Sequence, residues 1–308
     1  MSDGHVETVE LVENQGWDER IIVLRNEPLV DVFLIITERY VVVVDTLINP
    51  TTARKMMDVA EPYLQGKRSL LVVNTHSDYD HAWGNQIFAG PNAEYPAPII
   101  GHRTCVERFR LPESAPYLEE MQGEEPNIFG DVVLVPPTVQ FEEKMVIEGG
   151  DLTIELFPAM GHTPDHIALY IPEINTLIAA DAAEVPFPFA RYSKDMGEMI
   201  GTLENLTEMM AETVLYCHAP DVTSPQLLHD NLIYFQKLEQ HCRVALTSGK
   251  IPAEFDDELD LEVLIGYGLA DNEYQSFGMD DFHESYRTMG HRLQIKKMIE
   301  YLRLESGD

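Results

Sequence analysis

Hydrophobic residues fall in short runs that are separated by polar turns along the first part of the chain. The runs at 21–24, 32–36 and 41–44 are rich in β-branched side chains. Runs of this length and composition predict β-strands. Residues 50–64 differ, because apolar side chains recur there at helical spacing behind a pair of threonines, and this pattern predicts a helix.

Strand-like and helix-like segments continue to alternate as far as about residue 222. Further strands are predicted at 69–73, 99–101, 132–135, 145–147, 152–157, 167–171, 176–180 and 213–216. Helices are predicted at 82–90 and 197–211, with residues 103–130 irregular or helical, and then at 226–247, 258–264 and 292–304. We therefore predict two domains. Residues 1–222 hold both β-rich halves, and residues 223–308 form a helical extension that covers a pocket or makes a dimer contact.

Side chains of the kinds that bind metals follow four of these predicted strands. They are His76, Asp78, Asp80 and His81 after 69–73, His162 after 152–157, Asp181 after 176–180, and His218 after 213–216. Sites in layered α/β proteins collect at such strand ends. Imidazole and carboxylate ligands together suit zinc, iron or manganese. Seven ligands are too many for one zinc ion and fit two adjacent ions.

The order and spacing of these residues resemble the metallo-β-lactamase superfamily over most of residues 20–222. The family motif H-x-H-x-D-H is matched by His76-Ser77-Asp78-Tyr79-Asp80-His81, and its G-H-T-x-G-H segment by Gly161-His162-Thr163-Pro164-Asp165-His166. The resemblance implies an α+β fold, a four-layer αββα sandwich, here with the helical extension at the C-terminal side.

The resemblance also implies a role for each ligand. It places one ion on His76, Asp78 and His162, a second ion on Asp80, His81 and His218, and Asp181 between the two. Family enzymes use a hydroxide shared by two ions to attack an electrophilic centre. Asp80 is then expected to be the catalytic residue that orients the water and carries its proton toward the leaving group.

Two positions depart from the family motif. Asp78 stands where the family has a second histidine, so two divalent ions would keep one positive charge less than usual. A more electron-rich site favours harder metals. We therefore expect two divalent ions per chain, zinc first, with iron or manganese as the alternatives that Asp78 favours. The second departure is Asp165, which replaces a glycine.

Four further residues are candidates for supporting roles. His166 and Asp45 are expected to orient ligands by hydrogen bonding, although a simple turn aspartate is an open alternative for Asp45. Arg191 and Tyr192 follow the bridging aspartate and are candidates for contacts with substrate oxygens, with loop packing as the alternative.

Composition and charge argue against some classes of binding partner. The chain has 308 residues with 53 acidic and 21 basic side chains, a formal net charge of −32, and 44% hydrophobic residues. That hydrophobic content supports a folded core. The charge argues against nucleic acid and anionic membranes, because their phosphates would be repelled. We expect a small-molecule substrate and leave a homodimer open.

The cysteines and the first residues of the chain indicate the cellular compartment in which the protein is expected. Three distant cysteines form no disulfide framework, and neither a signal peptide nor a membrane span is visible. A soluble, cytoplasmic protein is therefore expected.

The leading hypothesis is a metal-dependent hydrolase that acts on a small ester, lactone, thioester or amide. One alternative is a di-iron oxidoreductase related to the flavodiiron oxygen and nitric oxide reductases, which also carry a carboxylate at the position of Asp78. That carboxylate is a glutamate in those enzymes, which are fused to a flavodoxin domain. A β-lactamase-like enzyme is a second alternative, and a binding protein on an inactive hydrolase scaffold is a third.

Overall fold

The computed structural model describes residues 7–27, 29–66, 68–91, 93–255, 259–278 and 286–307. The chain divides into two compact units that interleave along the sequence. The first unit comprises Met1–Pro158, Asp165–Ala180 and Thr213–Thr223, and the second comprises Ala159–Pro164, Asp181–Glu212 and Ser224–Asp308. The predicted domain boundary after residue 222 stays a prediction.

The first unit contains a mixed sheet whose strands lie in chain order. Its strands are β1 (Glu10–Leu11), β2 (Ile21–Asn26), β3 (Val30–Ile36), β4 (Tyr40–Val44), β5 (Ser69–Val73), β6 (Ile99–His102) and β7 (Val139–Phe141). Strands β1 to β4 pair antiparallel, and β4 to β7 pair parallel. Parallel neighbours need long crossovers, and α1 (Pro50–Leu64) supplies the one between β4 and β5.

A second mixed sheet of five strands belongs to the same unit. Its strands are β8 (Met145–Glu148), β9 (Thr153–Pro158), β10 (Ile167–Ile171), β11 (Thr176–Ala180) and β12 (Thr213–Tyr216), in the spatial order β12-β11-β10-β9-β8. Only β11 and β12 run parallel in this sheet. Their carboxyl ends therefore lie at the same edge.

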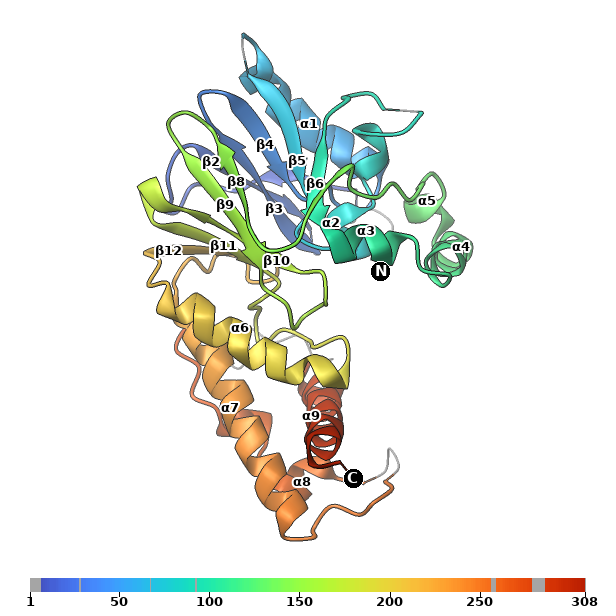
Figure 1. Cartoon of the computed structure of the whole chain (residues 1–308), viewed down its shortest axis with the longest axis vertical. Helices are drawn as coiled ribbons and strands as arrows, with labels where there is room; N and C mark the ends of the chain where they lie inside the picture. The colour runs from blue at the N-terminus through green and yellow to red at the C-terminus, as the bar shows by residue number, and fades with distance from the viewer. Residues whose placement is uncertain are drawn as a thin grey trace. The chain divides into compact units, whose positions relative to one another are not determined.

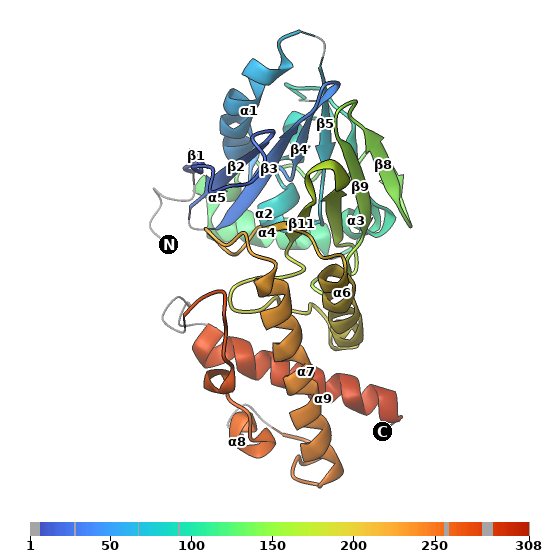
Figure 2. The same cartoon turned by 90° about the vertical axis from the view of Figure 1, so that its left-hand side faces the viewer.

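The core of the first unit is one apolar cluster to which both sheets and α1 contribute. Buried side chains of both sheets form one cluster, with Leu34 and Val43 from the first sheet and Ile154 and Ile178 from the second. Figures 1 and 2 show the sheets as separate layers. Burying two apolar faces against each other is what makes a sheet sandwich stable.

Helix α1 covers the first sheet on the side away from β8 and β9 (Figure 2). The Asn49 side chain caps it by accepting a hydrogen bond from the Thr52 backbone N–H at 2.9 Å, and Pro50 occupies the first turn. Met56, Met57 and Ala60 of this helix are fully buried in the core cluster. The predicted helix is thus confirmed over its whole length.

Shorter helical segments complete the first unit. They are α2 (Tyr79–Ala82), the 3₁₀ turns Asn85–Ile87 and Pro172–Ile174, α3 (Arg103–Phe109), α4 (Ser114–Glu124) and α5 (Pro126–Phe129). A small apolar cluster of Ile48, Trp83, Phe129 and Val132 lies among them.

The second unit is helical. It contains α6 (Met196–Glu208), α7 (Gln226–Thr247), α8 (Leu261–Ile265), α9 (His291–Ser306), the 3₁₀ turns Ser193–Asp195 and Leu269–Asp271, and the π-helical turn Tyr286–Gly290. Tyr234 and Leu238 of α7 are fully buried, as are Ile295 and Met298 of α9. Figure 1 shows α7 as the long helix of this unit (orange) and α9 beside it (red).

Three predicted elements need correction. Residues 132–135 lie in a described range and form no strand there. Pro136 and Pro137 follow, and proline cannot donate to a sheet, so pairing begins only at β7, which was not predicted. The helix predicted at 82–90 is broken into α2 and a 3₁₀ turn, with Gly84 between them. The helix predicted at 258–264 starts outside the described residues, since 258 is not described, and the observed helix α8 begins at Leu261 and ends at Ile265.

The αββα prediction is confirmed as a fold of two packed mixed sheets with helices. None of the helices in the described ranges has both the length and the apolar character that a membrane crossing requires.

Candidate metal centre

The ends of two strands have an uncommon backbone conformation. Asp45 follows β4 with φ at 66°, and Ala180 ends β11 with φ at 47°. Both angles lie in the left-handed region, which non-glycine residues adopt at a cost and mostly at functional sites. Asp45 reaches the end of β5 from there, and Asp181 follows directly on Ala180 in the sequence.

Three predicted ligands of the first unit converge on one point. The Asp80 Oδ2 atom lies 3.3 Å from Nε2 of His218 and 3.6 Å from Nε2 of His81. The two Nε2 atoms are 3.4 Å apart. His81 is fully buried, whereas the side chains of Asp80 and His218 retain 11% and 23% exposure. The three donor atoms therefore form a compact triangle that solvent can reach.

Asp45 holds the other side of the His81 ring. Its Oδ2 atom is 2.9 Å from His81 Nδ1, and it accepts a hydrogen bond from the Thr75 hydroxyl at 2.6 Å. Oδ1 accepts the Thr75 backbone N–H at 2.7 Å. Burial raises the pKa of the Asp45 carboxyl, and its partners His81 and Thr75 oppose that shift. A carboxylate in this position directs Nε2 of His81 toward Asp80 and His218.

His76 and Asp78 lie next to this triangle. The His76 ring centroid is 4.1 Å from that of His81, and its Nδ1 is 3.1 Å from the Thr75 hydroxyl. His76 Nε2 is 3.9 Å from Asp78 Oδ2. His166, which was predicted to orient a ligand, is buried with its ring 5.1 Å from that of His76. The structure thus brings both predicted supporting residues of this unit against predicted ligands.

The loop that carries His218 is anchored to the first sheet. The backbone N–H of Asp31 in β3 donates to the Cys217 carbonyl at 2.9 Å, one residue before His218. This hydrogen bond joins the two sheets just before His218, where the chain leaves β12.

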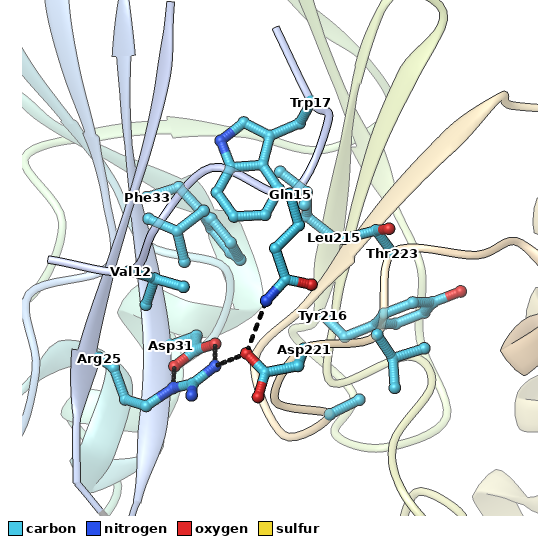
Figure 3. Close-up of a pocket in the computed structure, with 13 residues that line it drawn as sticks. Val12, Gln15, Trp17, Arg25, Asp31, Phe33, Leu215, Tyr216, Asp221 and Thr223 are labelled. Carbon is cyan, nitrogen blue, oxygen red and sulfur yellow. Dashed lines mark hydrogen bonds and ion pairs between the residues drawn. The ribbon is translucent and has the colours of Figure 1, made fainter. Parts of the chain in front are cut away.

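A charged network surrounds that anchor. Arg25 donates to Asp31 at 2.7 Å and contacts Asp221 at 3.3 Å, and the Gln15 amide donates to Asp221 at 3.0 Å. Figure 3 shows Arg25 between the two carboxylates, at a cavity of about 20 Å³ that Trp17 also lines. Burial raises the pKa of the Asp31 carboxyl, and Arg25 opposes the shift. The network keeps the residues that flank His218 in place.

The second unit holds the other two predicted ligands, together with a carboxylate that the sequence analysis missed. His162 Nε2 lies 3.6 Å from Asp181 Oδ2, and its Nδ1 lies 3.4 Å from Glu184 Oε1. Asp181 and Glu184 are buried, and the His162 side chain is 14% exposed. The ring therefore lies between two carboxylates, in the same way as the ring of His81.

The turn before His162 requires glycine. Gly161 has φ at 133°, and a Cβ atom on it would come within 2.4 Å of the Met199 Cα in α6. Further along, the backbone N–H of Arg191 donates to the His162 carbonyl at 2.9 Å. The side chains of Arg191 and Tyr192 are exposed, as substrate contacts would need to be. The role predicted for these two residues stays a prediction.

Arg108 of α3 is a second residue that the sequence analysis missed. Its guanidinium donates to Asp165 Oδ1 at 2.7 Å and to Asp78 Oδ1 at 3.2 Å. Both positions that depart from the family motif are therefore joined by one arginine. The only signal in the sequence is the pair of unusual aspartates, which suggests a compensating cation without saying which one.

The chain matches the model of a known protein family. The model of the metallo-β-lactamase superfamily matches residues 25–218, well over half of the chain. The chain belongs to the metallo-β-lactamase superfamily. The predicted resemblance is thereby confirmed, and the matched range includes all seven predicted ligands.

Solved structures share the metallo-β-lactamase fold at low sequence identity. A metallo-β-lactamase from Pontibacter korlensis is 14% identical with a TM-score of 0.54, over 74% of this chain and 99% of that chain. A stereoselective inverting sec-alkylsulfatase from Pseudomonas sp. is 18% identical with a TM-score of 0.59, over 81% of this chain and 46% of that chain. A metallo-β-lactamase family protein from Thermus thermophilus is 17% identical with a TM-score of 0.53, over 77% of this chain and 82% of that chain.

Five of the seven predicted ligands of this metallo-β-lactamase superfamily member lie in its first unit, and two lie in its second. Groups of histidine and carboxylate side chains that could hold a metal ion occur within each unit, namely Asp80 with His81 and His218, and His162 with Asp181 and Glu184. That all seven predicted ligands bind one pair of ions stays a prediction from the family motif.

Proposed function

We propose that this chain is a metal-dependent hydrolase that binds two divalent ions and cleaves a small ester, lactone, thioester or amide. The proposal rests chiefly on the triangle of Asp80, His81 and His218. Zinc binds nitrogen and oxygen ligands at about 2.0–2.2 Å in a tetrahedron, so neighbouring ligand atoms lie about 3.3–3.6 Å apart. The three separations of 3.3, 3.4 and 3.6 Å fall in this range.

The donor set also fits the proposed chemistry. Two imidazole nitrogens and one carboxylate oxygen form one face of a tetrahedron. The other side of the ion would stay open to a bridging ligand, water or substrate, as in catalytic rather than structural zinc sites. Divalent ions held in such a centre supply a hydroxide nucleophile near neutral pH and polarise the substrate oxygen.

The protein residues then have distinct tasks. Asp45 keeps the proton of His81 on Nδ1, so that Nε2 presents its lone pair to the ion. We propose the same task for Glu184, whose Oε1 atom lies 3.4 Å from His162 Nδ1. Asp80 is buried but not sealed from solvent, and we propose that it takes a proton from the attacking water and passes it to the leaving group.

For the substrate, we propose a small and neutral or weakly charged molecule, because the chain carries a net charge of −32. Arg191 and Tyr192 are proposed as contacts to its oxygen atoms. One structural neighbour is a sec-alkylsulfatase, so sulfate esters belong among the compounds to be tested. The neighbour from Pontibacter korlensis is a metallo-β-lactamase, which adds β-lactams to the test.

A di-iron oxidoreductase is the second candidate, and Asp78 is the observation that favours it. A carboxylate in place of a histidine makes the site harder and more suited to iron. Reduction of iron-loaded protein under anaerobic conditions, followed by oxygen, separates the two candidates. Reoxidation without any hydrolysis of the compounds tested would favour the oxidoreductase.

The experiment that tests the proposal combines metal counting with hydrolysis. The purified chain and its Asp80→Asn variant are loaded with zinc or manganese and assayed on esters, lactones, thioesters, amides, sulfate esters and β-lactams. About two ions per chain and an activity that Asp80→Asn abolishes would support the proposal. A control is Asp230→Asn, which removes a buried carboxylate of α7 that accepts the backbone N–H groups of Gln275 and Ser276. Failure to bind metal, or equal activity in Asp80→Asn, would refute it.

A further inference from the structure

We infer that Arg108 restricts Asp78 to binding a metal through one oxygen and thereby sets the metal preference of the centre toward zinc. This inference rests on the proposed metal centre. It assigns a role to a residue that lies outside both family motifs.

The two oxygens of Asp78 face different partners. Oδ1 accepts a hydrogen bond from Arg108 Nη2 at 3.2 Å, while Oδ2 lies on the side of His76 Nε2, at 3.9 Å. A carboxylate that binds a metal through both oxygens must turn both of them to the ion. Since Arg108 engages Oδ1, Asp78 is left to bind through Oδ2.

Arg108 is in turn held by Asp165. Its Nη1 atom donates to Asp165 Oδ1 at 2.7 Å, and the other oxygen of Asp165 accepts the Ser77 backbone N–H at 2.9 Å. Asp165 is fully buried, and the side chains of Arg108 and Asp78 are each 15% exposed. A buried carboxylate with both oxygens engaged is a rigid anchor for a guanidinium. It also ties Arg108 to the backbone one residue before Asp78.

Arg108 also changes the charge that Asp78 offers to a metal ion. The guanidinium withdraws electron density from the Asp78 carboxylate and offsets part of its negative charge. A one-oxygen ligand paired with a cation is closer to the histidine that the family has at this position. Zinc prefers four ligands and accepts such a donor, whereas manganese favours more oxygen ligands. The two departures from the motif and Arg108 therefore act together.

The test measures the affinity of the whole chain for zinc and for manganese in separate titrations. Metal-free protein is titrated with each metal against a chromophoric chelator, for the wild type and for Arg108→Met. Loss of a residue that holds a metal ligand costs about 10- to 100-fold in affinity. We expect Arg108→Met to show this loss for zinc but not for manganese, so that the ratio of zinc to manganese affinity falls by about the same factor. X-ray absorption of manganese-loaded Arg108→Met is expected to show one more oxygen around the metal than in the manganese-loaded wild type. Arg108→Lys, which keeps the charge but not the fork of two donors, is expected to give an intermediate ratio.

Arg103→Met is the matched control, since Arg103 lies on the same helix and pairs with two exposed surface residues, Glu107 at 3.3 Å and Glu142 at 2.8 Å. Its ratio should equal that of the wild type. If Arg108→Met does not fold because Asp165 stays charged and buried, the double variant Arg108→Met/Asp165→Asn removes that charge and should show the same fall. An unchanged ratio in the folded variants would overturn the inference while the proposed hydrolase stands. A wild type that binds neither metal would overturn both.

Discussion

Replacing Asp45 by asparagine tests how the first unit prepares His81 for metal binding. The Thr75 backbone N–H donates to Oδ1 at 2.7 Å, so the asparagine oxygen must take that place. Its NH₂ group then occupies the place of Oδ2, 2.9 Å from His81 Nδ1. An amide can only donate there. The histidine proton is consequently driven from Nδ1 to Nε2, the atom that faces Asp80 and His218.

The expected loss of metal affinity follows from that change of the His81 tautomer. A protonated Nε2 has no lone pair for a metal ion, and the charge-assisted bond from Asp45 is lost as well. Loss of such a supporting residue lowers metal affinity about 10- to 100-fold, which corresponds to about 1.4–2.7 kcal/mol. The metal-free protein should lose little stability, because the asparagine oxygen still accepts the Thr75 backbone N–H, its NH₂ group can donate to the Thr75 hydroxyl, and a buried charge is removed.

The assay is calorimetric titration of metal-free Asp45→Asn with zinc, alongside denaturant unfolding of the metal-free form. Asp230→Asn serves as the control, because Asp230 is a buried carboxylate of the second unit that holds backbone N–H groups. It is expected to bind zinc like the wild type. Zinc affinity within about threefold of the wild type in a folded Asp45→Asn would show that the reasoning about the tautomer is wrong.

Three further predictions concern other parts of the chain. Glu184→Gln should weaken zinc binding by about tenfold, since the carboxylate lies 3.4 Å from His162 Nδ1; unchanged zinc titrations would contradict this. Leu34→Ala should lower the free energy of unfolding by about 2–5 kcal/mol, because Leu34 is fully buried in β3. Leu11 is exposed, so Leu11→Ala should change that free energy little in the same denaturant melts. Burial lowers the pKa of His291, so that below about pH 6.5 the unfolded chain takes up a proton that the folded protein does not. As the pH is lowered from that value, the free energy of unfolding should therefore decrease by up to about 1.4 kcal/mol per pH unit. His291→Gln should show a shallower fall, and equal slopes in melts between about pH 5 and about pH 7 would count against this assignment.

The predicted strands that the structure confirms are those whose signal is local. Strand β3 reads Val-Asp-Val-Phe-Leu-Ile-Ile and is buried along its whole length. Its β-branched and aromatic residues are of the kinds that are enriched in strands. Strand β7 is only three residues long and was not predicted, because its pairing with β6 depends on neighbours far away in the chain.

The same distinction holds for the metal centre. His76 to His81 form one contiguous motif at the end of a strand, so residue types and spacing already indicate ligands. Arg108 lies 30 positions from Asp78 and 57 from Asp165, and no local pattern marks it as their partner. Glu184 is likewise one acidic residue among 53 acidic side chains.

The sequence by itself determined the family, the fold class and the residue types that end the strands, because these depend on motifs and periodicities within a few residues. The tertiary structure decided which nitrogen of His81 faces Asp80 and which oxygen of Asp78 Arg108 engages. Those details depend on distances of about 3 Å between distant segments. Such distances are fixed only when the strands and helices of a unit pack together.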